Sequence, residues 1–274
     1  IPSLFANCLG LKQIVIPDTV TEIRDYAFEN CSNLIDLKLS NNLEYIGRGA
    51  FQNCSALEKI GLPKSLKETD CLWTTGVSMP GIFEGCNNLK EVTFEEGTTC
   101  ITARVIENCL GIENIVIPEG VTEIQYGAFK NCEKLSSIQI PKSVTDIGKE
   151  AFYNCPLLDM TELPENIERL GQRAFYGCNN LKSILIPKSL SEITENTYGY
   201  GPFEKCINLE TIIFEEGTPQ ILEQICFKCT GLKNIEIPNT VLEIQPYSFY
   251  GCSSLENVDV LEGICKIDLN AFGE

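Results

Sequence analysis

Ile14–Cys31, which reads IVIPDTVTEIRDYAFENC, is one copy of a unit that recurs to the end of the 274-residue chain. One cysteine marks the same place in every copy, and its eleven occurrences are Cys8, Cys31, Cys54, Cys86, Cys109, Cys132, Cys155, Cys178, Cys206, Cys229 and Cys252. The interval from Cys8 to Cys31 recurs in eight of the ten steps. The other two steps, Cys54 to Cys86 and Cys178 to Cys206, are longer and carry insertions of nine and five residues. A fixed period of this kind predicts an array in which each unit packs on its neighbours.

The other apolar columns of the unit keep the same register and predict its local structure. Phe stands three places before the cysteine in nine copies, and Leu or Ile stands three places after it in all eleven. The alternation at Leu37 and Leu39 predicts a short strand. Pro directly follows this strand position in seven copies and ends the strand, because Pro cannot donate to a ladder. A second extended segment follows, and the spacing of Ala27, Phe28 and Cys31 predicts one turn of helix facing the core.

One unit cannot bury its apolar face alone, whereas a stack of units can. We therefore predict an α/β repeat in which equivalent strands form a parallel sheet along the array. Residues 1–274 are predicted to form a single solenoid of about eleven to twelve units, with insertions near 70–80 and 195–202. The chain opens and stops inside a repeat, so we expect its ends to be trimmed and infer nothing from them about a signal segment.

Composition narrows the possible functions. The formal net charge of −17 argues against nucleic acid and anionic membranes as partners, because both need a basic face. No apolar run approaches the roughly 20 residues that span a bilayer. The chain has no histidine, which excludes Ser-His-Asp and Cys-His nucleophiles and histidine-ligated metals. We predict no catalytic residues, no cofactor and no metal site.

The eleven column cysteines are predicted to be free thiols packed in the core, whereas Cys71, in the first insertion, is predicted to be an exposed thiol. Equivalent side chains in stacked coils run parallel, which keeps their Cβ atoms farther apart than a disulfide allows. The CxxC motif at Cys226 and Cys229 has two interpretations. It is either a redox pair or half of a zinc site, or it results from a one-residue slip of the repeat register. We favour the slip, in which Phe227 has left the Phe column and Cys226 fills the vacated place.

The motif Leu-x-x-Ile-x-Ile-Pro-x-x-Val-x-x-Ile, followed by Ala-Phe-x-x-Cys, resembles the BspA-type leucine-rich repeat, and Leu135–Cys155 is a close copy. The resemblance covers essentially the whole chain. It implies a right-handed leucine-rich-repeat solenoid with the parallel sheet on its concave side. It also implies a secreted or surface-anchored protein of anaerobic or mucosal bacteria that adheres to host matrix proteins or other microbes.

Two groups of residues are predicted to contact a partner. Outward strand positions carry apolar side chains at Val15, Val116, Met160, Leu185 and Ile213. The two insertions carry the aromatic residues Trp73, Tyr198 and Tyr200. Aromatic side chains dominate binding hot spots, although these rings could instead fold back over the core.

The leading hypothesis is a non-enzymatic cell-surface or secreted binding module whose partner is a protein or glycan at a host or microbial surface. It involves neither nucleic acid nor membrane insertion. One alternative is an intracellular acidic protein that binds a basic protein stoichiometrically. Another is a thiol-dependent enzyme, which the absence of histidine disfavours.

Overall fold

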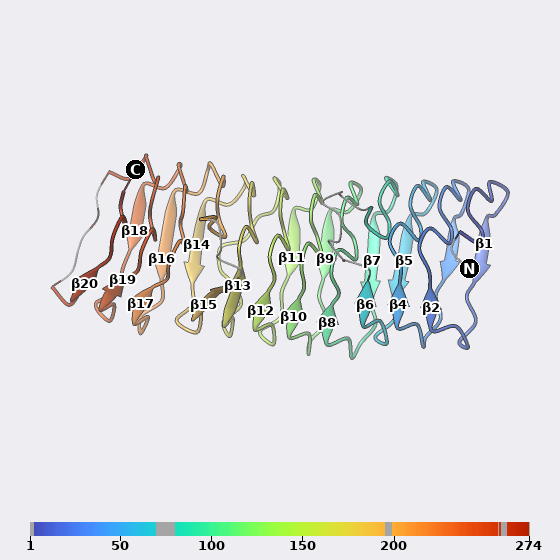
Figure 1. The fold of residues 1–274 in the computed structure, drawn as a ribbon, viewed down its shortest axis with the longest axis horizontal. Helices are drawn as coiled ribbons and strands as arrows, with labels where there is room; N and C mark the ends of the chain where they lie inside the picture. Colours follow the sequence, from blue (N-terminus) through green and yellow to red (C-terminus); the bar gives the residue numbers. More distant parts are fainter. Residues whose placement is uncertain (1–2, 70–79, 195–198, 257, 259–261, 274) are drawn as a thin grey trace.

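The computed structural model describes residues 3–69, 80–194, 199–256, 258 and 262–273. In this part of the chain, successive coils stack side by side along the long axis of an elongated body (Figure 1). Each coil supplies short strands in up to two rows, and within each row strands of neighbouring coils pair in parallel. The predicted solenoid with a parallel sheet is confirmed.

The strands fall into two rows, which we name by their order within a coil. The first row holds β1 (Gln13–Val15), β3 (Asp36–Lys38), β5 (Lys59–Leu62), β7 (Glu91–Phe94), β9 (Asn114–Val116), β11 (Ser137–Gln139), β14 (Ser183–Ile186), β16 (Thr211–Phe214) and β18 (Asn234–Glu236). The second row holds β2 (Glu22–Ile23), β4 (Tyr45–Ile46), β6 (Glu68–Thr69), β8 (Cys100–Ile101), β10 (Glu123–Ile124), β12 (Asp146–Ile147), β13 (Arg169–Gly171), β15 (Glu192–Thr194), β17 (Gln220–Ile221), β19 (Glu243–Ile244) and β20 (Lys266–Ile267).

The register of the first row follows the repeat. The first-row strands form four sheets, β1-β3, β5-β7, β9-β11 and β14-β16-β18. Ile14 pairs with Leu37, which holds the same position in the next copy, and both point toward the core. Across the first insertion Ile60 pairs with Val92, again its equivalent in the next copy, so the first row absorbs the extra length without a register change. Alternate side chains of a strand point to opposite faces, so the residues between these inward positions form an outward face.

The α/β prediction is wrong, because the described residues contain no helix and every regular element is a strand. The segment predicted to be a helical turn is a run of tight turns instead. The amide of Phe28 donates to the carbonyl oxygen of Ala50 in the next coil, at 2.7 Å, and the amide of Asn30 donates to Gln52 at 2.8 Å. Alternate amides therefore tie coil to coil, whereas a helix would direct them to the residue four positions earlier.

Left-handed residues are the physical reason for these turns. The residue just before the column cysteine has a φ between 54° and 77° in all eleven coils, with Asn30 at 59° as an example. In the same coil Tyr26 also has a positive φ, of 55°. A right-handed helix needs negative φ at every residue, so two left-handed residues four positions apart cannot belong to one.

Phe side chains form stacked columns through the core. Phe129, Phe152, Phe175 and Phe203 lie ring over ring, with centroids 5.0–5.4 Å apart. The column is interrupted at Ile106 and at Cys226, one coil beyond each insertion. Beside Cys226, Phe227 stacks on Tyr250 with centroids 5.3 Å apart, and the Cys226 side chain is fully buried. The one-residue slip predicted for the CxxC motif is confirmed.

The cysteine column also lies in the core, and all its members are free thiols. Nine of them are buried, while Cys8 and Cys252, near the ends of the stack, are partly exposed. The buried thiols donate to backbone carbonyl oxygens: Cys155 Sγ donates to Phe129 at 3.1 Å, and Cys54 Sγ donates to Phe28 at 3.3 Å. Cysteine thus combines small apolar volume with a weak donor that satisfies a carbonyl.

These thiols should resist alkylation in the native protein. Burial raises the pKa of Cys31 to about 11 and that of Cys155 to about 12, so almost no thiolate exists at neutral pH. We expect a maleimide titration of native protein at pH 7.5 to label the exposed Cys265 quickly and the nine buried column cysteines only after denaturation. Rapid native labelling of most column cysteines would contradict their burial.

The insertions interrupt the second row. Its strands form three sheets, β2-β4-β6, β8-β10-β12-β13-β15 and β17-β19-β20. The two breaks follow β6 and β15, the strands that precede the two insertions in the sequence. Residues 70–79 and 195–198, which include Cys71, Trp73 and Tyr198, lie outside the described residues.

Candidate binding surface on the first strand row

The predicted apolar positions do not form one continuous patch. Val15 and Val116 are exposed by 66% and 61%, and their neighbours in the next coil are Lys38 and Gln139. Each valine is therefore an isolated apolar side chain in a polar row, which is common on protein surfaces.

Leu185, Ile213 and Met160 do come together. Leu185 in β14 pairs with Ile213 in β16, and both side chains are partly buried. Met160 and Leu185 line the same groove on the first row. The structure thus gathers three of the five predicted apolar residues in adjacent coils.

The prediction that Met160 is an outward strand position is wrong. In the segment Leu158–Leu163, regular alternation would bury Thr161 and expose Met160. Instead Met160 packs against the core and Thr161 is exposed. The physical reason is that a slip of one residue exchanges the two faces of a strand, and burial of Met is favoured over burial of Thr. The coil consequently forms no first-row strand, although it keeps β13 in the second row, and its first-row segment makes one bridge, from Glu162 to Leu185.

This irregular coil opens a groove of about 560 Å³ beside β11. Ile138 and Ile140, on the β11 coil, are only partly buried. The equivalent residues of the preceding coil, Ile115 and Ile117, are exposed by 2% and 3%. The groove therefore exposes core residues that are covered in the preceding coil.

The rim of the groove is acidic. It carries the carboxylates of Asp159, Glu162, Glu165 and Glu215 and a single ammonium group, that of Lys142. Lys142 Nζ lies 2.5 Å from Glu165, and this hydrogen bond raises the pKa of Lys142. The amide of Lys188 donates to Glu215 and lowers the pKa of that carboxyl. The ammonium group of Lys188 also lies 3.3 Å from Glu215, so two of the four carboxylates have a lysine partner. Asp159 and Glu162 form no ion pair within the described residues, and they keep the rim acidic.

Two further hollows are less suited to bind an apolar ligand. One, of about 380 Å³, lies between β3 and β5, but its inward residues Leu37, Leu39 and Leu62 stay within 7% exposure. The other, of about 550 Å³, lies on the second row and is lined mainly by charged residues. Some of these charges pair with each other, as Lys67 does with Glu44 at 2.7 Å.

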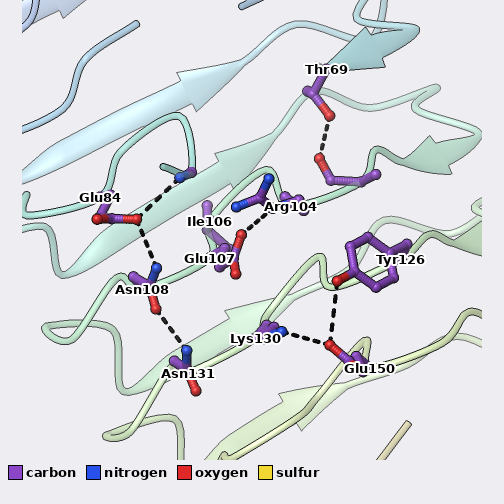
Figure 2. Close-up of polar contacts among 12 residues, drawn as sticks. Thr69, Glu84, Arg104, Ile106, Glu107, Asn108, Tyr126, Lys130, Asn131 and Glu150 are labelled. Atoms are coloured by element: carbon purple, nitrogen blue, oxygen red, sulfur yellow. Dashed lines mark hydrogen bonds and ion pairs between the residues drawn. The ribbon is translucent and has the colours of Figure 1, made fainter. Parts of the chain in front are cut away.

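A cluster of polar side chains, several of them buried, lies in the successive coils between Glu84 and Glu150 (Figure 2). Arg104 forms an ion pair with Glu107, with the two side chains only 7% and 5% exposed. Glu150 accepts hydrogen bonds from Lys130 at 2.5 Å and Tyr126 at 3.3 Å.

Ile106, which replaces Phe in the column, lies beside Glu107 (Figure 2), and the charges of Glu107 and Arg104 compensate each other. Burial raises the pKa of Glu107, and Arg104 opposes that shift. The cluster has the character of a structural network, because its buried carboxylates Glu107 and Glu150 already hold cationic partners.

Tyr200 lies away from the groove. Its ring faces the guanidinium of Arg173, with Arg173 Cζ 3.6 Å from the ring centroid. Arg173 Nε also donates to Glu204 at 3.3 Å. Tyr200 is partly buried by this stacking, and because Trp73 and Tyr198 lie outside the described residues, the role of the insertions stays a prediction.

Within the described ranges, no three or more Cys, Asp or Glu side chains are grouped as metal ligands. The same part of the chain contains no helix long and apolar enough to cross a membrane.

Parallel coils of one recurring length, with stacked Leu, Phe and Cys columns, define this chain as a leucine-rich-repeat solenoid. The chain belongs to the family described as BspA type leucine rich repeat region, whose sequence profile matches residues 2–72, 79–202 and 147–274 in six copies. No curated protein matches the chain.

Solved structures of leucine-rich-repeat proteins are similar to this chain. A protein from Bacteroides ovatus is 26% identical, with a TM-score of 0.66, over 100% of this chain and 79% of its own. One from Eubacterium ventriosum is 19% identical, with a TM-score of 0.56, over 98% and 78%. The pneumococcal vaccine antigen PcpA is 20% identical, with a TM-score of 0.51, over 95% and 64%. The last two similarities concern the fold alone.

Proposed function

We propose that this solenoid is a non-enzymatic module of a bacterial surface or secreted protein, and that it binds a protein ligand on the outward face of the first strand row. The single observation that carries the proposal is the outward pair Leu185 and Ile213 beside an acidic groove that Met160 also lines. Membership of the BspA-type family supports adhesion as the purpose of the binding. Trp73, Tyr198 and Tyr200 are proposed as a second contact region.

A charge introduced into the apolar cluster tests the proposal. The variant carrying Leu185→Glu and Ile213→Glu should lose at least about tenfold in affinity for its ligand, because two apolar contacts worth about 1.5–3 kcal/mol each are replaced by anions. Binding is measured by surface plasmon resonance against a panel of purified matrix proteins and mucin.

The matched control is Val116→Glu, at an exposed and isolated apolar position of the same row. It should bind as the unchanged protein does. Circular dichroism melting confirms that all variants fold. Undiminished binding by the double variant, or equal loss in the control, would refute this face as the binding surface.

A further inference from the structure

The groove beside β11 contains an unpaired strand edge. The amides of Ile16 and Ile117 donate to Lys38 and Gln139 in the following coils, at 2.8 and 3.2 Å. Ile140 occupies the equivalent place, but its amide has no such acceptor within the fully described segment 136–164. The carbonyl of Ile138 likewise lacks the interaction that Thr161 makes with the amide of Leu185.

The irregular coil is bonded to the opposite side of the gap. Leu163 donates to the carbonyl of Leu185 at 3.1 Å, and Leu185 donates to Thr161 at 2.8 Å. Toward the preceding coil, the first-row part of this segment makes one backbone hydrogen bond, from Asp159 to Ser136 at 3.1 Å. The described part of β11 thus pairs with β9 alone and leaves its other edge to the groove.

An unpaired edge of this kind accepts an extended peptide, whose main chain completes the ladder while its side chains enter adjoining pockets. Here the floor beneath the edge is apolar, formed by Ile138, Ile140 and Met160. On the rim, Glu165 and Glu215 already pair with lysines, whereas Asp159 and Glu162 form no ion pair among the described residues and are open to a cationic ligand. The complementary ligand therefore alternates apolar and cationic side chains.

We propose that this groove binds a short extended segment of a partner protein, with Lys or Arg beside apolar residues, by strand addition to β11. The proposal rests on the proposed function, since it names the chemistry of the ligand for the same surface. Lys or Arg of the segment pairs with Glu162 and Asp159, and its apolar side chains cover Ile138 and Ile140.

Closing the groove by restoring the strand is the sharpest test. The variant Met160→Ser with Thr161→Ile gives this coil the residues that Ser183 and Ile184 provide in the next one. Regular alternation then returns, the strand pairs with β11, and the melting temperature is retained or rises. The probe is a fluorescein-labelled hexapeptide of alternating Lys and Val. Its binding to the protein is measured by fluorescence anisotropy. We expect the variant to lose on the order of tenfold or more in affinity.

Charge variants test the rim separately. The double variant Asp159→Asn with Glu162→Gln should bind the basic peptide about three- to tenfold more weakly. Glu236 is an exposed carboxylate outside the groove, and Glu236→Gln should not change the affinity. A hexapeptide of alternating Glu and Val should not bind.

The inference is overturned if the unchanged protein does not bind the basic peptide, if it binds both peptides equally, or if the strand-restored variant binds normally. Each of these results leaves the proposed function intact. The proposed function fails when Leu185→Glu with Ile213→Glu leaves matrix-protein binding undiminished, or when Val116→Glu loses as much binding.

Discussion

Replacing Phe152 by Ala should lower the free energy of unfolding by about 3–5 kcal/mol, the range for removing a buried aromatic ring from a core. The Phe152 side chain is fully buried and stacks on both sides, with Phe129 at 5.0 Å and Phe175 at 5.2 Å. The cavity would remove two stacking contacts in the middle of the array, where coils on each side hold the backbone in place.

Phe5→Ala is the matched control, because Phe5 belongs to the same column but is partly exposed and stacks only on Phe28 among the described rings, at 5.0 Å. Phe5→Ala should lower the free energy of unfolding by less than half as much as Phe152→Ala. Urea unfolding followed by circular dichroism measures both variants. Similar losses of unfolding free energy in the two variants would show that a ring in a middle coil contributes no more stability than one at the end. That result would contradict the nearest-neighbour packing expected of a solenoid.

Arg104→Met should destabilise the protein by about 3–5 kcal/mol near neutral pH, because it leaves a buried carboxylate without its partner. The Glu107 side chain is 5% exposed, and its neighbour Arg104 is 7% exposed (Figure 2). Methionine keeps much of the length and apolar stem of arginine, so the loss reports mainly on the uncompensated charge.

The loss of stability in Arg104→Met should grow as the pH rises. Burial raises the pKa of Glu107 in the folded protein, and removing Arg104 raises it further. A carboxyl with a raised folded pKa binds its proton more tightly when folded, so stability falls as pH increases from the unfolded value of about 4.3 through the folded one. Urea unfolding of the variant at pH 5 and pH 8 should therefore show a smaller loss at pH 5.

Lys142→Met is the control for Arg104→Met. It removes the cation of an ion pair in which both side chains are well exposed, at 79% and 62%. Water solvates the remaining Glu165 carboxylate, so the unfolding midpoint should not change. A pH-independent loss in the Arg104 variant would mean that packing, and not the buried charge, accounts for its effect.

Much of the fold could be predicted from the sequence because the repeat copies each local signal many times. Leu37, Leu39 and their equivalents alternate at the period of a strand, and the same columns identified the stacked core. The free cysteines and the slip at Cys226 followed from the same register. The error over the helical turn arose because apolar residues at Ala27, Phe28 and Cys31 suit either a helix or a set of tight turns.

The left-handed residues could have been recognised. Asn or Gly directly precedes the column cysteine in nine of eleven copies, as at Asn30 and Gly85, and both residue types favour positive φ. That signal weighs against a helix. The partners of the amides, however, lie in the next coil, so the hydrogen bond from Phe28 to Ala50 is invisible in a single repeat.

For the binding surface, the tertiary structure decided more than the sequence could predict. Sequence alone places Val15, Val116, Leu185 and Ile213 on the outward face, because alternation along a strand is a local property of the backbone. Whether those residues meet depends on register between coils, which groups Leu185 with Ile213 and leaves Val116 beside Gln139. Only the stacked structure decides the orientation of Met160, since the choice between burying Met160 and burying Thr161 is made by the core that neighbouring coils supply. The open edge of β11 and its acidic groove follow from that choice.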